Sequence, residues 1–353
     1  MKIKTDKLLS IVIPAYNVEK YIERCLISLT KDEEVLKKVE LIVVNDGGVD
    51  KTLEIAKRYE NKFQTSIIVI DKENGGHGST INAGLKVATG KYFRVIDSDD
   101  WVNVDDFPKF VKELKSIDAD VVLTNYSKEF VYNGTSEFFS YNPEIEYNKV
   151  YNFDDFNISL LKDDYFFMAT TTFKTEVLRK ANFNLDEKTF YVDTEFVIFP
   201  IPFVNTFIYL NYDIYRYFIG RKDQSVNISS FVKNRSHHEK VLKRVIKFYN
   251  NTELSENKKK YISKIIIQLI NTHYVIYCKS KLNKKEHLKE IKNLDRYLRD
   301  NAFELYDISG RIYGYIRWNR RTKFIFAQAK KSWFSRLIDF YERRNSIKGG
   351  ELN

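Results

Sequence analysis

Three acidic residues within four positions form the densest group of reactive side chains in the sequence. Asp97, Asp99 and Asp100 directly follow residues 92–96, an apolar stretch typical of a buried strand. Carboxylates this close together repel one another unless a cation compensates their charge. Their oxygens suit Mn²⁺ or Mg²⁺, which take one or two protein carboxylates and complete their coordination with substrate phosphates. The spacing therefore predicts a divalent-cation site, and an acidic turn before the next helix is the alternative.

Three other apolar stretches end in residues that suit a nucleotide. The first ends at Tyr16, the second at Asp46, and the third leads into the glycine-rich loop 74–79 (NGGHGS). The carboxylate of Asp46 can accept a hydrogen bond from a base N–H while the Tyr16 ring packs on the base face, and an ordinary turn is the alternative for Asp46. The glycines let backbone amides approach an anion at a helix N-terminus. We therefore expect a nucleotide site at these strand ends.

The elements that would position these groups form a strand–helix series over the first 125 residues. Short β-branched stretches predict strands, and apolar residues at three-to-four spacing predict helices. The expected strands are 8–14, 39–45, 66–70, 92–96 and 119–124, and the expected helices are 18–29, 51–61, 79–88 and 104–116. Such a series favours a mainly parallel sheet whose ligands bind beyond the carboxyl ends of the strands. Further strands are expected at 166–173 and 203–217, and a hairpin turn at Asn133-Gly134.

Charge divides the chain near residue 230. Residues 1–230 hold 29 Lys/Arg and 36 Asp/Glu, whereas residues 231–353 hold 29 Lys/Arg and 12 Asp/Glu. We therefore expect an acidic domain at 1–230 and a basic, mainly helical domain at 231–353 that contacts an anionic partner. A solvated lysine-rich surface is the alternative.

Several protein classes do not fit this composition. No stretch of about 18 apolar residues is present, so a membrane-spanning protein is excluded, and the N-terminus lacks the apolar core of a signal peptide. Cys25 and Cys278 are far apart and have no metal-binding pattern around them, which favours the cytoplasm over a disulfide scaffold. A dinucleotide oxidoreductase would need G-x-G-x-x-G after the first strand, where Pro14 and Ala15 stand instead.

The strand-end motifs resemble, in order and spacing, those of family 2 glycosyltransferases. They are SIVIPAYN at 10–17, VNDGGVDKT at 44–52, NGG at 74–76 and IDSDDW at 96–101. The resemblance covers residues 8–125 closely, thins over 126–230 and is lost beyond. It implies the nucleotide-sugar-binding GT-A fold, a Rossmann-like α/β architecture with a mixed, mainly parallel sheet. Here that fold would be followed by a helical C-terminal region.

The resemblance also implies a role for each matched position. Pro14, Ala15, Tyr16 and Asp46 would hold the base of a nucleotide sugar, most often UDP. Further donor-binding positions are Gly75, Gly76, His77, Asp97 and Asp100, of which Asp97 contacts ribose or metal and Asp100 faces the donor sugar. Asp99 would ligate Mn²⁺ or Mg²⁺. The family's phosphate-contacting Arg is replaced by Ile81, so His77, Ser79, Arg216 or Arg221 would substitute for it.

A transferase also needs a base to accept the proton of the acceptor hydroxyl. In the family this is the Asp of a Glu-Asp pair, and Asp193 stands at that spacing, with Val192 in place of the Glu. Glu195 is the reserve candidate, because on a strand it would share the face of Asp193, although in a helix the two would diverge by about 200°. One base opposite the leaving group implies inversion. Residues 215–226 resemble the family's closing loop, with Arg216, Arg221 and Ser225 as candidates.

The C-terminal region offers weaker signals. Residues 324–344 have an aromatic stripe flanked by Lys and Arg, which is typical of a helix lying on anionic lipid, and packing on its own domain or a second subunit is the alternative. Residues 261–278 are apolar enough to be core. His237 and His238 are expected to be an exposed pair, with a third metal ligand as the alternative. The Gln-x-x-Arg-Trp motif of processive synthases is not found, which favours transfer of a single sugar.

These observations predict an inverting, metal-dependent glycosyltransferase of bacterial surface-polysaccharide synthesis, with a glycan or lipid-linked acceptor. A catalytically idle nucleotide-sugar-binding scaffold subunit is the alternative, and no nucleic acid is expected as a partner. The expected location is the cytoplasm, with the basic C-terminal region on the inner face of the plasma membrane. An oligomer is compatible with the sequence.

Overall fold

The computed structural model describes residues 7–161, 165–220, 228–279, 284–322 and 324. Two compact units divide the chain: Met1–Arg221 with Glu253–Lys258, and Lys222–Thr252 with Lys259–Asn353. The described strands all lie in the first unit, and the second is helical. Among the described residues, no helix is long and apolar enough to cross a membrane.

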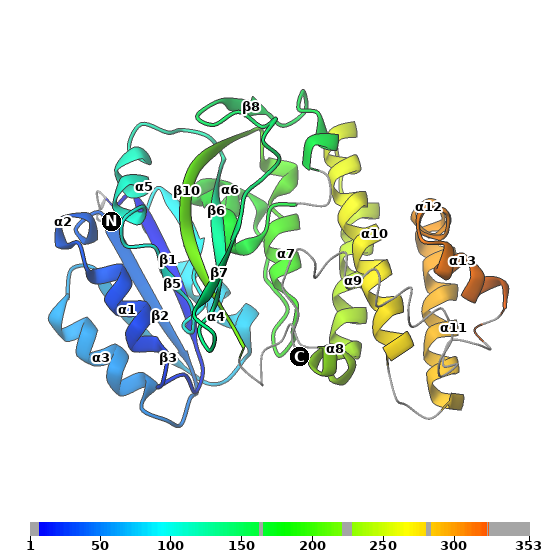
Figure 1. Ribbon diagram of the computed structural model, residues 1–353, viewed down its shortest axis with the longest axis horizontal. Coiled ribbons are helices and arrows are strands. Elements are labelled where there is room, and N and C mark those ends of the chain that lie inside the picture. The colour runs from blue at the N-terminus through cyan, green and yellow to red at the C-terminus, as the bar shows by residue number, and fades with distance from the viewer. Residues whose placement is uncertain (1–6, 162–164, 221–227, 280–283, 323, 325–353) are drawn as a thin grey trace. The chain divides into compact units, whose positions relative to one another are not determined.

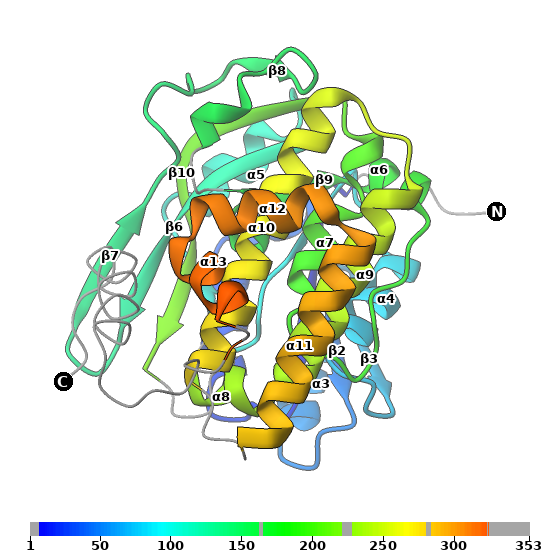
Figure 2. The same cartoon turned by 90° about the vertical axis from the view of Figure 1, so that its right-hand side faces the viewer.

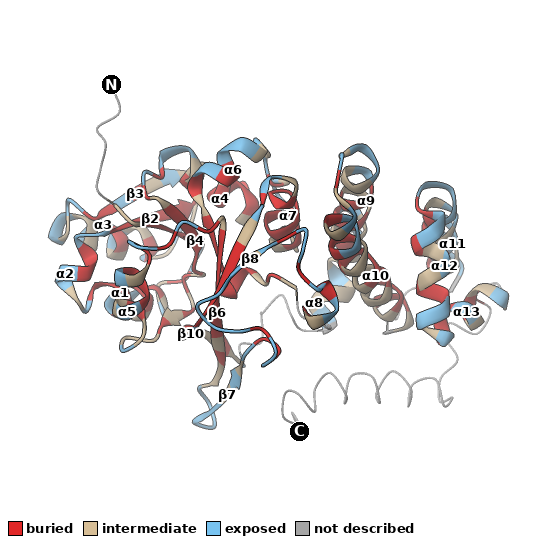
Figure 3. Ribbon diagram, turned by 90° about the horizontal axis from the view of Figure 1, so that it is seen from above, coloured by how far each residue is buried: buried red, intermediate tan, exposed pale blue. Residues whose placement is uncertain are grey.

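The first four strands form a parallel array that carries the candidate site. They are β1 (Leu9–Ala15), β2 (Val39–Asp46), β3 (Ile67–Lys72) and β4 (Tyr92–Val95), in the spatial order β3-β2-β1-β4. Figure 1 labels β1, β2 and β3, and Figure 3 labels β4. Strands β1, β2 and β4 are buried on both faces (Figure 3), as their mainly apolar sequences predict, and each also buries a polar residue: Ser10, Glu40 and Arg94. The predicted strands 8–14, 39–45, 66–70 and 92–96 are confirmed to within one or two residues at each end.

The other strands extend this array into one ten-stranded mixed sheet. Strand β9 (Thr171–Lys174) runs antiparallel between β4 and β6 (Val121–Phe130), and β10 (Thr206–Ile219) is parallel to β6. Strands β5 (Trp101–Val102) and β8 (Val150–Asn152) pair with β10, and β7 (Thr135–Phe139) forms the predicted hairpin with β6, with Gly134 at φ 70°. The strand prediction 166–173 is wrong for 166–170: residues 166–167 have no regular structure, and the chain forms a 3₁₀ turn (Met168–Thr170) before β9 begins.

Helices cover both faces of the parallel array. Helices α1 (Ile22–Thr30), α2 (Glu33–Leu36) and α5 (Phe107–Glu113) share a hydrophobic core with Leu9, Ile11 and Ile13 of β1, and α3 (Thr52–Lys62) contributes Ala56 to it. Helix α4 (His77–Val87) packs on the opposite face, where Gly84 lies against Val12. The remaining short elements of this unit are α6 (Thr175–Ala181), α7 (Asp193–Ile198) and the 3₁₀ turns Ile158–Leu161 and Ile201–Phe203.

The second unit is a set of amphipathic helices (Figure 2). They are α8 (Ile228–Lys233), α9 (Arg235–Asn251), α10 (Glu256–Lys279), α11 (Lys284–Asn301), α12 (Phe303–Ile312) and α13 (Gly314–Arg321). The predicted core segment 261–278 lies in α10, and most of its apolar side chains are buried, including Ile262, Ile266 and Tyr274. The predicted amphipathic helix 324–344 lies outside the described residues except for Phe324.

One prediction for this unit is wrong. His238 is buried rather than exposed, because its ring stacks on that of His273 with centroids 5.1 Å apart. The Nδ1 atoms of the two rings lie 3.0 Å apart. Since His238 is one turn away from hydrophobic positions such as Val241 and Leu242, the amphipathic phase of α9 places it on the buried face.

Candidate active site

The predicted nucleotide site lies at the carboxyl ends of the parallel strands. In the parallel register Ala15 stands opposite Asn45, and Asp46 stands opposite Lys72. The ring of Tyr16 beyond β1 is 52% exposed, whereas Ala15 and Pro14 are buried. The exposed ring is therefore available to pack on a ligand, and the two residues before it shape the wall behind it.

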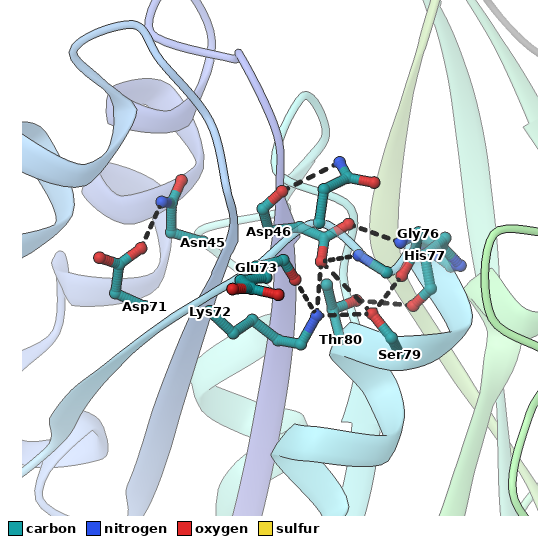
Figure 4. A network of polar contacts seen from close by, with 11 residues as sticks. Asn45, Asp46, Asp71, Lys72, Glu73, Gly76, His77, Ser79 and Thr80 are labelled. Atoms are coloured by element: carbon teal, nitrogen blue, oxygen red, sulfur yellow. Dashed lines mark hydrogen bonds and ion pairs between the residues drawn. The ribbon is translucent and has the colours of Figure 1, made fainter.

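Asp46 is the centre of a polar network (Figure 4). Its Oδ1 accepts hydrogen bonds from Lys72 Nζ at 2.8 Å and the Gly75 amide at 2.9 Å, and its Oδ2 accepts from the Gly76 amide at 2.7 Å. The side chain is only 4% exposed. A buried carboxylate is stable only when it is paired in this way. Asp46 therefore holds the glycine-rich loop, a role that the sequence reading did not include.

Lys72 is a cation that the sequence reading missed. Besides Asp46, it donates to the Ser79 hydroxyl at 3.0 Å, and its side chain keeps 26% of its exposure. It thus brings positive charge to the glycine-rich loop, whereas Ile81, which replaces the family's Arg, lies in helix α4. The position of Lys72 at the end of β3, two residues before the NGG motif, is the only sequence signal that could have identified it.

A chain segment far away in sequence fixes the other side of the glycine-rich loop. The Lys188 amide donates to the Gly75 carbonyl, and Asn82 exchanges two hydrogen bonds with the Leu185 backbone, at 2.9 and 3.0 Å. Gly76 has φ 82°, and a Cβ on Gly78 would lie 2.4 Å from the Asp186 carbonyl oxygen. Glycine is therefore required at both positions, and residues 185–189 form a strap over the loop.

His77 joins the loop to the acidic motif. Its Nε2 lies 2.9 Å from Oδ1 of Asp97, and both side chains are about one-third exposed. Burial lowers the pKa of His77, but the charges of Asp97, Asp193 and Asp99 outweigh it, so the pKa is raised above its ordinary value. His77 therefore contacts Asp97 directly, and the charges of Asp193 and Asp99 act on the same imidazole.

Asp100 does not face a donor sugar, and that prediction is wrong. Its side chain is fully buried: Oδ1 accepts from the Phe218 amide at 2.8 Å and Oδ2 accepts from the Tyr215 hydroxyl. Burial, together with the charges of Asp99 and Asp97, raises its pKa well above the usual range. Asp100 therefore ties the acidic motif to β10.

The other side of the acidic motif is held by Arg24. Its Nη2 donates to the Asp99 carbonyl at 2.8 Å, and its guanidinium lies 3.7 Å from the ring centroid of Trp101. The stacked cation is thereby fixed against an aromatic face. Among the described residues, no group of three or more His, Cys, Asp or Glu side chains is placed to bind a metal. The carboxylates of Asp97 and Asp99 still fit a cation that takes two protein ligands and completes its coordination with phosphates.

The candidate base and its reserve point in different directions. Asp193 and Glu195 lie in helix α7, not on a strand, so they do not share a face. Glu195 is fully buried and accepts from the Asp186 amide at 2.9 Å, which anchors the strap. The prediction of Glu195 as a reserve base is therefore wrong. Asp193 is partly exposed, and burial raises its pKa while the charge of His77 opposes the rise.

Of the two candidate arginines, Arg216 lies within the described residues. Arg216 lies on β10, where its guanidinium pairs with Glu129 at 2.8 Å and with Asp213 at 3.0 Å. Two carboxylates therefore pair with it within the sheet, and its contact with the donor stays a prediction. Arg221 and Ser225 lie outside the described residues.

Comparison with known proteins defines the class. The fold is that of GT-A nucleotide-sugar enzymes: it resembles the structure of residues 1–349 of TarS from Staphylococcus aureus, with a TM-score of 0.66 at 20% identity over 91% of this chain and 90% of that one. The TarS structure in complex with UDP-GlcNAc gives a TM-score of 0.64 at the same identity. At this identity the likeness shows the fold alone.

The family is identified by sequence. Residues 10–180 match the model described as glycosyl transferase family 2, so the chain carries a domain of that family. GlyA, a glycosyltransferase of Streptococcus pneumoniae, is 32% identical over 162 residues, which are 45% of this chain and 22% of that protein. TarS, the poly(ribitol-phosphate) beta-N-acetylglucosaminyltransferase of S. aureus, is 34% identical over 32% of this chain and 20% of its own length. The chain thus matches only about a fifth of the length of these two relatives.

Proposed function

We propose that the protein is an inverting glycosyltransferase that moves one sugar from a UDP-sugar to a hydroxyl of a glycan or lipid-linked acceptor in bacterial surface-polysaccharide synthesis. The family 2 domain supports the reaction class, and the UDP-GlcNAc complex of TarS supports the type of donor. The observation that carries the proposal is the contact of His77 with Asp97, 2.9 Å apart, beside the glycine-rich loop that Asp46 holds.

The residues divide the work of the reaction. Tyr16 offers its exposed ring to the base, and Asp97 and Asp99 supply carboxylates toward the diphosphate. Mn²⁺ or Mg²⁺ bound there would stabilise the charge of the departing nucleoside diphosphate. Lys72 and His77 place positive charge and hydrogen-bond donors on the same side. Lys72 and His77 would therefore take over the electrostatic role of the missing Arg.

Asp193 acts as the base in this proposal. A carboxylate whose pKa is raised by burial holds a proton more tightly and therefore accepts one more readily from a hydroxyl. The charge of the neighbouring His77 opposes this rise. The accepted proton then remains on the Asp193 carboxyl until the product leaves.

Donor binding is the first test. Melting temperatures would be measured with UDP-, GDP-, dTDP- and CMP-sugars, with and without Mn²⁺, for the unchanged protein, for Asp99→Ala and for Asp105→Ala. Asp105 is an exposed carboxylate outside the site and serves as the matched control. We expect a Mn²⁺-dependent rise with a UDP-sugar that Asp99→Ala loses and Asp105→Ala keeps. No rise with any nucleotide sugar would contradict the proposal and favour the scaffold alternative.

For residues 231–353 we propose contact with an anionic surface, because this segment holds 29 basic and 12 acidic residues. Electrostatic attraction to anionic lipid weakens as salt rises. Flotation with vesicles of anionic and of neutral phospholipid tests this. Binding to the anionic vesicles alone, lost at high salt, is the expected result, and equal binding to both would contradict the proposal.

A further inference from the structure

Hydrogen bonds hold the acidic motif in a tight turn. The Asp100 amide donates to the Asp97 carbonyl at 3.0 Å, and the Asp97 amide donates to the Tyr215 hydroxyl at 3.3 Å. Asp100 is fully buried, whereas the Asp97 side chain keeps 30% of its exposure and Asp99 is half-buried. Strand β10 therefore fixes one side of the turn, and the two candidate cation ligands, Asp97 and Asp99, occupy its less buried positions.

The peptide unit that follows Asp99 is held from helix α1. Nη2 of Arg24 donates to the Asp99 carbonyl oxygen at 2.8 Å, a contact between residues 75 positions apart in the sequence. Because a peptide unit is planar, its orientation is set by the φ and ψ angles on either side of it. A bond to this carbonyl therefore restrains ψ of Asp99 and, with it, the direction of the Asp99 side chain relative to the turn.

Two aromatic rings fix the guanidinium of Arg24. Its central carbon lies 3.7 Å from the ring centroid of Trp101 and 4.9 Å from that of Phe218. A planar guanidinium can stack flat on a ring, which a compact lysine ammonium cannot. Phe218 is also the residue whose amide bonds to Asp100. Arg24 therefore contacts the motif at Asp99 and Trp101, and it also contacts the strand that holds Asp100.

The contacts of Arg24 clamp the backbone and do not form an ion pair. Among the residues that the structure describes, Arg24 has no carboxylate partner, and its Nε has no hydrogen-bond partner. An arginine that neutralises a carboxylate commonly donates two parallel hydrogen bonds to it. Arg24 bonds to the backbone of Asp99 instead, so it does not occupy the Asp99 carboxylate.

We propose that Arg24 is a positioning residue for the divalent cation, because it holds the Asp99 peptide so that the carboxylates of Asp97 and Asp99 converge on one ion. This role rests on the proposed metal-dependent transfer and adds a residue that sets the affinity for the cation. The charge of Arg24 acts in the opposite direction, since a cation beside the site repels Mn²⁺. On removal of Arg24, positioning therefore predicts weaker Mn²⁺ binding, whereas charge alone predicts tighter binding.

Mn²⁺ binding to the full chain tests this role without turnover. Titrations followed by the electron paramagnetic resonance signal of free Mn²⁺, with UDP present, give the Kd for Mn²⁺. The unchanged protein would be compared with Arg24→Met, which keeps the apolar stem, and with Arg24→Lys, which keeps the charge. Arg179→Met is the matched control, because Arg179 also donates to a backbone carbonyl, that of Ala88, but lies in helix α6. Urea denaturation shows which variants are folded.

We expect the Kd for Mn²⁺ to rise fivefold or more in Arg24→Met, to rise less in Arg24→Lys, and to stay unchanged in Arg179→Met. An unchanged or lower Kd in folded Arg24→Met would overturn the proposal. If only Arg24→Lys folds, an unchanged Kd in that variant would overturn it. Absence of Mn²⁺ binding to the unchanged protein would contradict the metal dependence of the proposed function, and the role of Arg24 with it.

Discussion

The two units bury ionisable groups in opposite ways. In the first unit, the buried carboxylates of Asp46, Asp100 and Glu195 accept hydrogen bonds from backbone amides, and each ties a loop or helix to its neighbour. In the second unit, His238 and His273 stack on each other, and burial lowers the pKa of both rings. The buried carboxylates hold the loops of the candidate site in place, whereas the buried histidine pair makes the stability of the second unit depend on pH.

The largest effect is expected from Asp100. Replacement by Ala removes the acceptor of the Phe218 amide and the Tyr215 hydroxyl, both of which stay buried. We predict a loss of about 2–4 kcal/mol in the free energy of unfolding, measured by urea denaturation. The exposed control Asp105→Ala should change it by less than about 0.5 kcal/mol. Equal effects of the two substitutions would mean that the carboxylate of Asp100 holds nothing.

The histidine pair should make the second unit sensitive to acid. Burial lowers the pKa of His238 to about 4, from an ordinary value near 6.5. For His273, burial and the charges of His238, Lys243 and Arg235 act in the same direction. The unfolded state therefore binds protons first, so the stabilisation is complete above about pH 6.5 and is lost as the pH falls toward 4.

The shift of His238 alone corresponds to about 3 kcal/mol. Urea denaturation at several pH values, followed by a signal of the second unit, measures this loss. His238→Gln should reduce the loss, and the neighbouring control His237→Gln should leave it unchanged. A stability that is flat between pH 4 and 6.5 would show that the stacked pair is not neutral in the folded protein.

A smaller effect is expected for the strap over the glycine-rich loop. Glu195→Gln keeps the shape of the side chain but weakens the bond that its carboxylate accepts from the Asp186 amide. We predict about 1 kcal/mol of destabilisation and faster hydrogen exchange at Asp186 and Lys188. If the strap of Glu195→Gln exchanges hydrogen at the same rate as that of the unchanged protein, Glu195 does not anchor the strap.

The parallel half of the fold could be predicted from sequence because its strands are short, mainly apolar stretches, three of which are buried on both faces. The strand ends carry their polar residues in chain order, so Asp46, His77 and Asp97 could be assigned to one edge of the sheet. The stretch 166–173 was wrongly predicted as a strand because its apolar side chains at 166–169 pack in the core without pairing in the sheet, and residues 168–170 form a 3₁₀ turn.

Side-chain direction could not be predicted. Asp100 and Asp99 are neighbours of the same type, yet only Asp100 meets the β10 backbone, and nothing local to the motif encodes that contact. The six residues Asp193–Ile198 form a helix, although their sequence is equally compatible with a strand. The helix points Asp193 and Glu195 in different directions, whereas a strand would have placed them on one face. Lys72 and the strap at 185–189 depend on contacts between segments distant in sequence, which a single sequence does not reveal.

The most direct test of the central claim is the rate of sugar transfer in a single turnover with Asp193→Asn and Glu195→Gln, using the UDP-sugar that binds best. Because Asp193 is proposed to accept the acceptor proton and Glu195 only anchors the strap, we predict a fall of about 10²–10⁴-fold for Asp193→Asn with donor binding retained. Glu195→Gln should keep most of the rate at temperatures where it is folded. An Asp193→Asn protein that transfers sugar at the unchanged rate would contradict the account.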